Sequence, residues 1–96
     1  MYRENTYEIT KRLIYKLAEE LHALVYPELK RQYPKFYEET IQAWSKVVIS
    51  EKRDWFYMDV HGIRFSIGKY TGDTYKDSKH IGKIATLTAQ DLFKAM

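Results

Sequence analysis

A chain of 96 residues, 45% hydrophobic and 30% charged, is long enough to form one globular domain with a modest core, predicted to span residues 1–96. The absence of cysteine excludes disulfides, thiolate nucleophiles and zinc sites that use cysteine ligands. A net charge of +3 is small for a dedicated nucleic-acid-binding domain. No apolar run reaches 18 residues and the N-terminus resembles no signal peptide, so we expect a cytoplasmic protein.

The first predicted element is an amphipathic helix from Asn5 to about Tyr26. Asn5 is a suitable N-cap, and Glu8 then occupies the third helical position. Pro27 is predicted to end the helix, because proline disfavours helical geometry in the residue before it. Apolar residues at helical spacing predict the buried face, which comprises Ile9, Leu13, Ile14, Leu17, Leu21, Leu24 and Val25.

A second helix is predicted from Pro34, at its first position, to about Ser50. Residues 28–32, between two Tyr-Pro dipeptides, are interpreted as a bent connector. The β-branched run at residues 47–49 leaves an alternative, in which the helix ends near Ser45 and an extra strand follows. The predicted buried face of this helix comprises Phe36, Tyr37, Ile41, Trp44, Val47 and Val48.

Residues 54–70 predict a β-hairpin with a two-residue turn at His61-Gly62. Gly62 accepts the positive φ that such a turn requires. The two-residue loop fixes the register and places Asp59 opposite Arg64, an oppositely charged cross-strand pair. The same register predicts an apolar inner face of Phe56, Met58, Val60, Ile63, Phe65 and Ile67, with Trp55 and Tyr57 on the other side.

After the hairpin, residues 71–80 are predicted to form a polar loop, and residues 81–87 a third strand that pairs with the hairpin edge. Thr88 is predicted to cap a final helix, with Asp91 in the capping-box position. The predicted fold is therefore α+β in the order ααβββα, with a three-stranded antiparallel sheet, a central hairpin and helices over one face.

Catalytic and metal-binding constellations are weak in this sequence. The three histidines lack metal-ligand spacing, and no glycine-rich phosphate loop is present. Tyr15, Glu19 and His22 share one helix stripe, which we interpret as a solvated face. Residues 77–79 have the Asp-x-Lys spacing of some nucleases, with Asp59 as a second carboxylate, but a polar loop does not hold such groups rigidly. We therefore predict no enzyme activity, catalytic residue, metal or cofactor.

The binding signals are stronger. Nine tyrosines are unusual for this length, and Trp55 and Tyr57 lie beside Arg64 on the outer hairpin face. Lysines alternate with tyrosines around the polar loop, as on surfaces that bind phosphates and stack on bases. The predicted binding residues, for protein or nucleic acid, are Trp55, Tyr57, Arg64, Lys69, Tyr70, Tyr75, Lys76, Lys79, His80 and Lys83.

Three functions remain open on these grounds. The favoured hypothesis is a non-catalytic protein-interaction module, such as an inhibitor, adaptor or assembly factor, because Tyr, Trp and Arg are enriched at interface hot spots. Small proteins encoded by phages and mobile elements often act on host complexes in this way, although no motif indicates such an origin. The alternatives are a nucleic-acid-binding protein that uses residues 69–83 and a small nuclease-like or toxin-like enzyme. Each is compatible with a homodimer, and none requires a membrane.

Overall fold

The computed structural model describes residues 6–96. Its elements are α1 (Thr6–Gln32), α2 (Glu38–Ser45), β1 (Val48–Lys52), β2 (Trp55–Val60), β3 (Ile63–Gly68), β4 (Asp73–Lys76), β5 (Lys79–Lys83) and α3 (Ala89–Ala95). The strands form one antiparallel sheet in the order β1-β2-β3-β4-β5, so each strand pairs with its neighbours in the chain. The α+β class is confirmed, but the sheet has five strands instead of the predicted three.

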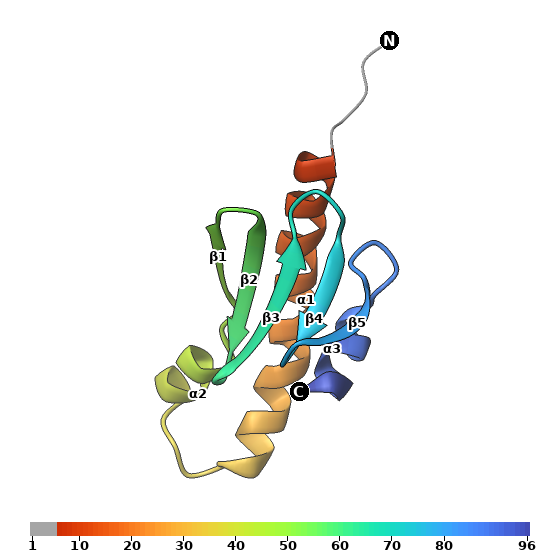
Figure 1. The fold of residues 1–96 in the computed structure, drawn as a ribbon. Coiled ribbons are helices and arrows are strands. Elements are labelled where there is room, and N and C mark those ends of the chain that lie inside the picture. Colours follow the sequence, from red (N-terminus) through yellow and green to blue (C-terminus); the bar gives the residue numbers. More distant parts are fainter. Residues whose placement is uncertain (1–5) are drawn as a thin grey trace.

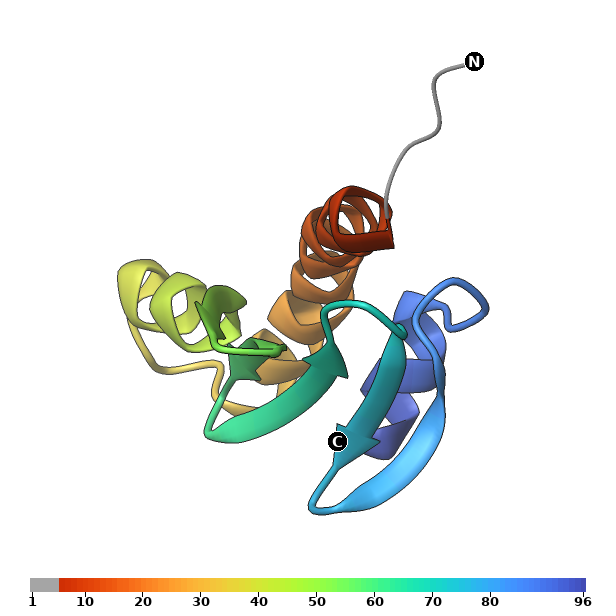
Figure 2. The same ribbon diagram turned by 45° about the horizontal axis from the view of Figure 1, so that its top comes forward.

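Figures 1 and 2 show how the helices sit on the sheet. α1 runs along one face, α3 covers the β4 and β5 end of that face, and α2 lies next to α1 near β1 and β2. Within residues 6–96, no helix is both long enough and apolar enough to cross a membrane.

The hairpin of β2 and β3 has the predicted register. Asp59 lies opposite Arg64, and the arginine donates to both carboxylate oxygens at 2.7 and 3.2 Å. His61 and Gly62 both adopt positive φ, at 47° and 78°. Five of the six predicted inner residues are buried, and Ile63 is partly buried. The predicted hairpin is therefore confirmed. It could be predicted because the turn and the alternation of apolar and polar residues are both local features of the sequence.

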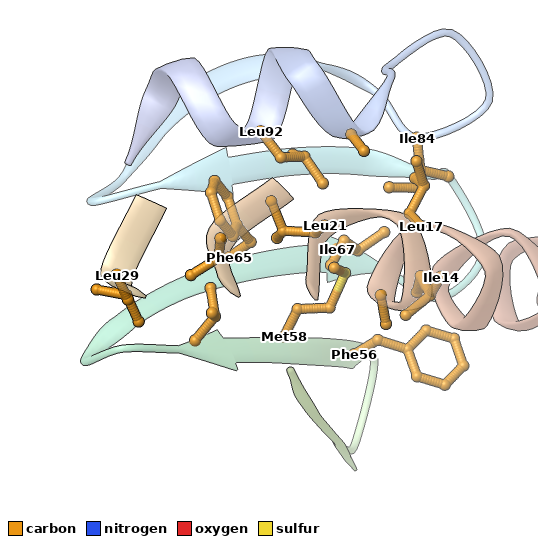
Figure 3. Packing of buried hydrophobic residues seen from close by; sticks show 14 of the residues in the cluster. Ile14, Leu17, Leu21, Leu29, Phe56, Met58, Phe65, Ile67, Ile84 and Leu92 are labelled. Atoms are coloured by element: carbon orange, nitrogen blue, oxygen red, sulfur yellow. The ribbon is translucent and has the colours of Figure 1, made fainter. Parts of the chain in front are cut away.

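One hydrophobic core lies between the helices and the inner face of the sheet. Side chains from α1, the hairpin and α3 meet there, as Figure 3 shows for Leu21, Phe65 and Leu92. The fully or nearly fully buried apolar residues are Ile14, Leu17, Ala18, Leu21, Val25, Leu29, Ile41, Phe56, Met58, Val60, Phe65, Ile67, Ile84, Ala89 and Leu92. Ile9, a predicted core residue, is instead 37% exposed.

The prediction that Pro27 ends the first helix is wrong, as is the bent connector at residues 28–32. α1 continues through Pro27 to Gln32. A proline inside a helix costs about 3 kcal/mol, whereas full burial of a leucine contributes about 1.5–3 kcal/mol. Leu29 is buried two residues later, and Lys30 pairs with Glu38 of α2 at 3.0 Å. Burial and pairing beyond the proline thus offset its cost. The predicted cap, Asn5, lies outside the described residues.

The second helix is shorter than predicted. α2 begins at Glu38, with Tyr37 as the extended N-cap, so Pro34 lies in a turn closed by Phe36 N donating to Tyr33 O at 3.2 Å. The prediction that Phe36 and Tyr37 lie in the core is wrong, because they are 52% and 81% exposed.

The predicted helix end at Ser50 is also wrong, and the extra strand that was the alternative is present. α2 ends at Ser45, Lys46 is extended, and β1 pairs along its whole length with β2. Ile49 lies opposite Met58 and is partly buried. The β-branched run fits this pleated edge better than a helix, where Ile49 would fall on the polar side.

The predicted loop at residues 71–80 instead contains β4 and the start of β5. Thr74 is fully buried between outward-facing neighbours, and Asp77 and Ser78 form a two-residue turn with φ of 51° and 67°. The predicted strand at residues 81–87 is therefore β5 at Lys79–Lys83, and it pairs with β4 and not with the hairpin edge. Polar composition and the absence of glycine in the turn concealed this second hairpin.

The final helix is confirmed. The Thr88 side chain accepts from the Asp91 amide at 3.1 Å, and the Asp91 carboxylate accepts from the Thr88 amide at 2.9 Å. These hydrogen bonds lower the pKa of Asp91, because they favour its charged form. Leu92 is fully buried and anchors α3 to the core.

Candidate functional site

The second face of the sheet is the main candidate site. α1 and α3 lie behind the sheet in Figure 1, and no helix of residues 6–96 crosses its front. We call this the open face. The strand registers place the following side chains on it: Val48, Ser50, Lys52, Trp55, Tyr57, Asp59, Arg64, Ser66, Asp73, Tyr75, His80 and Lys83.

Aromatic rings form a row across the open face. The ring centroids of Trp55 and Tyr75 are 5.7 Å apart and those of Tyr75 and His80 are 5.2 Å apart, both edge to face. β3 lies between β2 and β4 and contributes only Ser66 and Gly68 beside these rings, which leaves them room to meet. The Arg64 guanidinium lies 4.5 Å from the Tyr57 ring centroid. The row is thus a preorganised, partly exposed aromatic surface.

The charges of the open face are largely balanced. Asp73 Oδ1 lies 3.1 Å from both His80 Nε2 and Lys83 Nζ, and Asp59 pairs with Arg64. The pKa of Asp73 is lowered, first by the Lys83 hydrogen bond and then by that of His80. The Asp59 hydrogen bond raises the pKa of Arg64. The open face is therefore amphipathic and not a bare cationic surface.

The structure gathers six of the ten predicted binding residues on the open face, namely Trp55, Tyr57, Arg64, Tyr75, His80 and Lys83. Tyr70 lies in the loop between β3 and β4 and is 61% exposed. Lys76 lies opposite Phe65, on the inner face of the sheet, and its Nζ is 3.5 Å from the Asp77 carboxylate. Lys79 is exposed at the start of β5. The lysines that suggested a phosphate-binding loop therefore do not form one surface.

Lys69 is engaged inside the protein. Its Nζ lies 3.0 Å from Glu51 and 5.6 and 5.8 Å from the ring centroids of Phe56 and Tyr7. The Glu51 hydrogen bond raises the pKa of Lys69, and the Lys69 hydrogen bond is the main cause of the lowered pKa of Glu51. Its side chain is only 11% exposed. Lys69 therefore covers one end of the core, away from the open face.

A groove that the sequence analysis missed lies between α1, α2 and β1. It measures about 660 Å³, and Tyr15, Glu19 and His22, the stripe interpreted as solvated, form its α1 wall. The other wall comes from Gln42, Ala43, Lys46, Val47, Val48 and Ile49. The sequence analysis predicted a continuous helix through Ser50, and such a helix would not form this second wall. The β-branched run at residues 47–49 was the signal that could have revealed it.

An exposed aromatic cluster was missed as well. The Trp44 ring centroid lies 5.5 Å from that of Tyr33, 5.1 Å from that of Phe36 and 6.1 Å from that of His61. The cluster joins the turn after α1, α2 and the hairpin turn at one end of the molecule. The second Tyr-Pro dipeptide marks the turn, but only the tertiary fold brings His61 to it.

Asp73 gives a pH-dependent prediction. Because its folded pKa lies below the ordinary value of 3.8, it stabilises the fold above that value, and this contribution is lost as pH falls through the lower, folded pKa. We expect Asp73→Asn to unfold at lower urea concentration than the wild type at pH 7, and the difference to be smaller at a pH below 3.8. Urea titrations by circular dichroism at both pH values measure this. A constant difference between the two proteins would contradict it.

Comparison with protein-family models, curated proteins and solved structures finds no match to this chain. In the part of the chain that the structure describes, no three His, Asp or Glu side chains form a group that could hold a metal ion. Two surfaces remain as candidate sites: the aromatic open face of the antiparallel sheet, and the groove along its β1 edge.

Proposed function

We propose that this chain is a non-catalytic protein-interaction module that docks through the open face. The observation that carries the proposal is the aromatic row of Trp55, Tyr75 and His80 on a sheet face that no helix of residues 6–96 covers. Tyr57 and Arg64 extend this surface. Trp, Tyr and Arg are the residue types most enriched at interface hot spots, and rigid rings lose little entropy on binding.

The charge pattern favours a protein partner over nucleic acid. Asp59 pairs with Arg64, and Asp73 pairs with Lys83 and contacts His80, so Lys52 is the one lysine or arginine of the open face without an ion-pair partner among residues 6–96. A phosphate backbone needs cations that are free to replace its counterions, and carboxylates on the same face repel it. A protein surface can match both signs at once. Nucleic-acid binding therefore remains the second hypothesis, and the experiment below distinguishes the two.

The test begins with a tagged copy expressed in its native host, with benzoylphenylalanine at residue 57 to cross-link whatever contacts the open face. Parallel samples are treated with nuclease. We expect a cross-linked protein that survives this treatment, and the same analogue at Tyr37 serves as the control position because Tyr37 is 81% exposed and lies outside the open face. A cross-link that disappears with nuclease would favour nucleic acid and overturn the proposal.

The purified partner then gives a quantitative prediction. We expect Trp55→Ala to weaken binding at least about 30-fold, because hot-spot truncations cost 2 kcal/mol or more. Tyr57→Ala is expected to weaken it as well, and Tyr37→Ala to leave it unchanged, by calorimetric titration of proteins whose folding is checked by circular dichroism. Wild-type affinity in both Trp55→Ala and Tyr57→Ala would remove the open face from the interface.

Activity measurements on the same purified partner distinguish an inhibitor from an adaptor or assembly factor. An inhibitor lowers the activity of the complex that it binds, whereas an adaptor or assembly factor links two components without lowering it. The assignment to a host complex, of the kind that phage or mobile-element proteins target, rests on the identity of the partner recovered.

A further inference from the structure

A second hollow extends the groove along β1 as far as Glu51. It measures about 130 Å³ and is lined by Lys11, Tyr15, Ile49, Ser50, Glu51 and Phe56. Tyr15 and Ile49 also line the 660 Å³ groove, so the two hollows adjoin. Together they follow the gap between α1 and the free edge of the sheet, and Ala18, Ala43 and Ile49 give the gap an apolar lining.

The β1 edge is also open for backbone pairing. β1 pairs only with β2, in an unbroken register of five residue pairs, so alternate backbone amides and carbonyls face away from the sheet. The opposite edge is better protected, since β5 has lysines at both ends and an irregular register with β4 between Thr74 and Tyr75. β1 contains neither a bulge nor a proline. Free backbone groups and an adjoining apolar groove therefore lie side by side.

We propose that an extended, acidic segment of another protein adds to the sheet as a sixth strand beside β1. Side chains of a strand alternate between its two faces. Every second side chain of the added strand then enters the groove above Ala18 and Ala43, and those between remain on the side of the open face. The added strand thus satisfies the edge and fills the groove in a single docking event.

The positive charges along the β1 edge favour an acidic partner strand. Lys46 lies two residues before β1, Lys52 is its last residue and Arg53 follows it directly. None of these three cations has an ion-pair partner among residues 6–96. The Glu51 carboxylate is already neutralised by Lys69. Glu19 is the remaining carboxylate of the groove. Opposite charges placed across neighbouring strands stabilise pairing, so carboxylates on the added strand are favoured.

The same charges disfavour a second copy of this chain. Antiparallel pairing of two β1 strands brings Lys46 of each copy toward Lys52 and Arg53 of the other, at both ends of the interface. Like charges across strands are destabilising. This inference goes beyond the proposed function, because it concerns an edge and a groove rather than the open face, and either proposal can fail without the other.

The probe is a fluorescein-labelled nine-residue peptide of alternating valine and glutamate, titrated with the full chain by fluorescence anisotropy. The matched peptide carries lysine in place of glutamate. We expect the acidic peptide to bind at least about tenfold more tightly than the basic one, a difference of about 1.4 kcal/mol. Amide hydrogen exchange in β1 is expected to slow when the acidic peptide is bound. Equal binding of the two peptides, or no binding of either, would overturn the proposal.

Two variant pairs locate the site. Ala43→Trp fills the groove from an exposed position of α2, and Ala23→Trp adds the same side chain at an exposed position of α1 outside it. Lys52→Glu reverses the charge at the end of β1, and Lys35→Glu reverses a charge between α1 and α2, outside the residues that line the groove. We expect at least about tenfold weaker binding of the acidic peptide in the first member of each pair only. Equal effects within a pair would overturn the assignment, as would dimerisation by light scattering that Ala43→Trp abolishes.

Discussion

Phe65→Ala is expected to lower the free energy of unfolding by about 3–5 kcal/mol, the range for truncating a buried phenylalanine. Phe65 has no exposed surface and lies in β3, the central strand, with its ring directed toward the helices (Figure 3). Truncation removes the transfer energy of the ring and leaves a cavity that helices and sheet together cannot fill. The free energy of unfolding of a small domain is only about 5–15 kcal/mol in total, so this variant will be severely destabilised.

Urea unfolding followed by circular dichroism measures this effect, with Tyr37→Ala as the matched control. Tyr37 is 81% exposed and makes no ring contact within residues 6–96, so we expect its truncation to change stability by less than about 0.5 kcal/mol. A loss below about 1 kcal/mol for Phe65→Ala would show that the core between β3 and the helices is not packed as described.

The last turn of α1 gives the second large effect. Leu29→Ala is expected to cost about 2–5 kcal/mol, because the buried side chain is removed and leaves a cavity beside the core. Pro27→Ala is expected to stabilise the protein by about 2 kcal/mol. An interior proline costs about 3 kcal/mol, from which about 0.4–1 kcal/mol is subtracted for the added freedom of the unfolded chain.

Urea titrations of both variants measure these opposite signs, and amide hydrogen exchange at residues 28–33 shows where they act. We expect faster exchange there in Leu29→Ala and slower exchange in Pro27→Ala. Unchanged stability in both variants would contradict a helix that continues through the proline and is held by Leu29.

The hairpin and the final capping box could be predicted because their determinants are close in the sequence. The His61-Gly62 turn sets the register of β2 and β3, and Thr88 and Asp91 satisfy each other within one helical turn. Tertiary contacts decided the features that were predicted wrongly. Burial of Leu29 keeps the helix intact beyond its proline, and β2 draws the segment after Ser45 into the sheet.

The same distinction applies to the candidate sites. Trp55, Tyr57 and Arg64 could be placed on one face from the hairpin register alone, and Tyr75 and His80 join them through β4 and β5, which the polar composition concealed. The groove along β1 is formed by α1, α2 and β1 together, so the β-branched run at residues 47–49 indicates only its β1 wall. The prediction of a lysine-rich phosphate-binding surface was the least accurate. Lysines that are close in the sequence can lie on opposite faces of a strand.

The order of the strands has a consequence for how the chain folds during its synthesis. Because every strand pairs with its neighbour in the chain, the sheet can assemble hairpin by hairpin with short loops to close. α1 is made before the strands, yet the side chains that bury its apolar stripe, including Met58 and Phe65, belong to those strands. On the ribosome the helix must therefore remain without its core partners until the β2 and β3 hairpin has emerged.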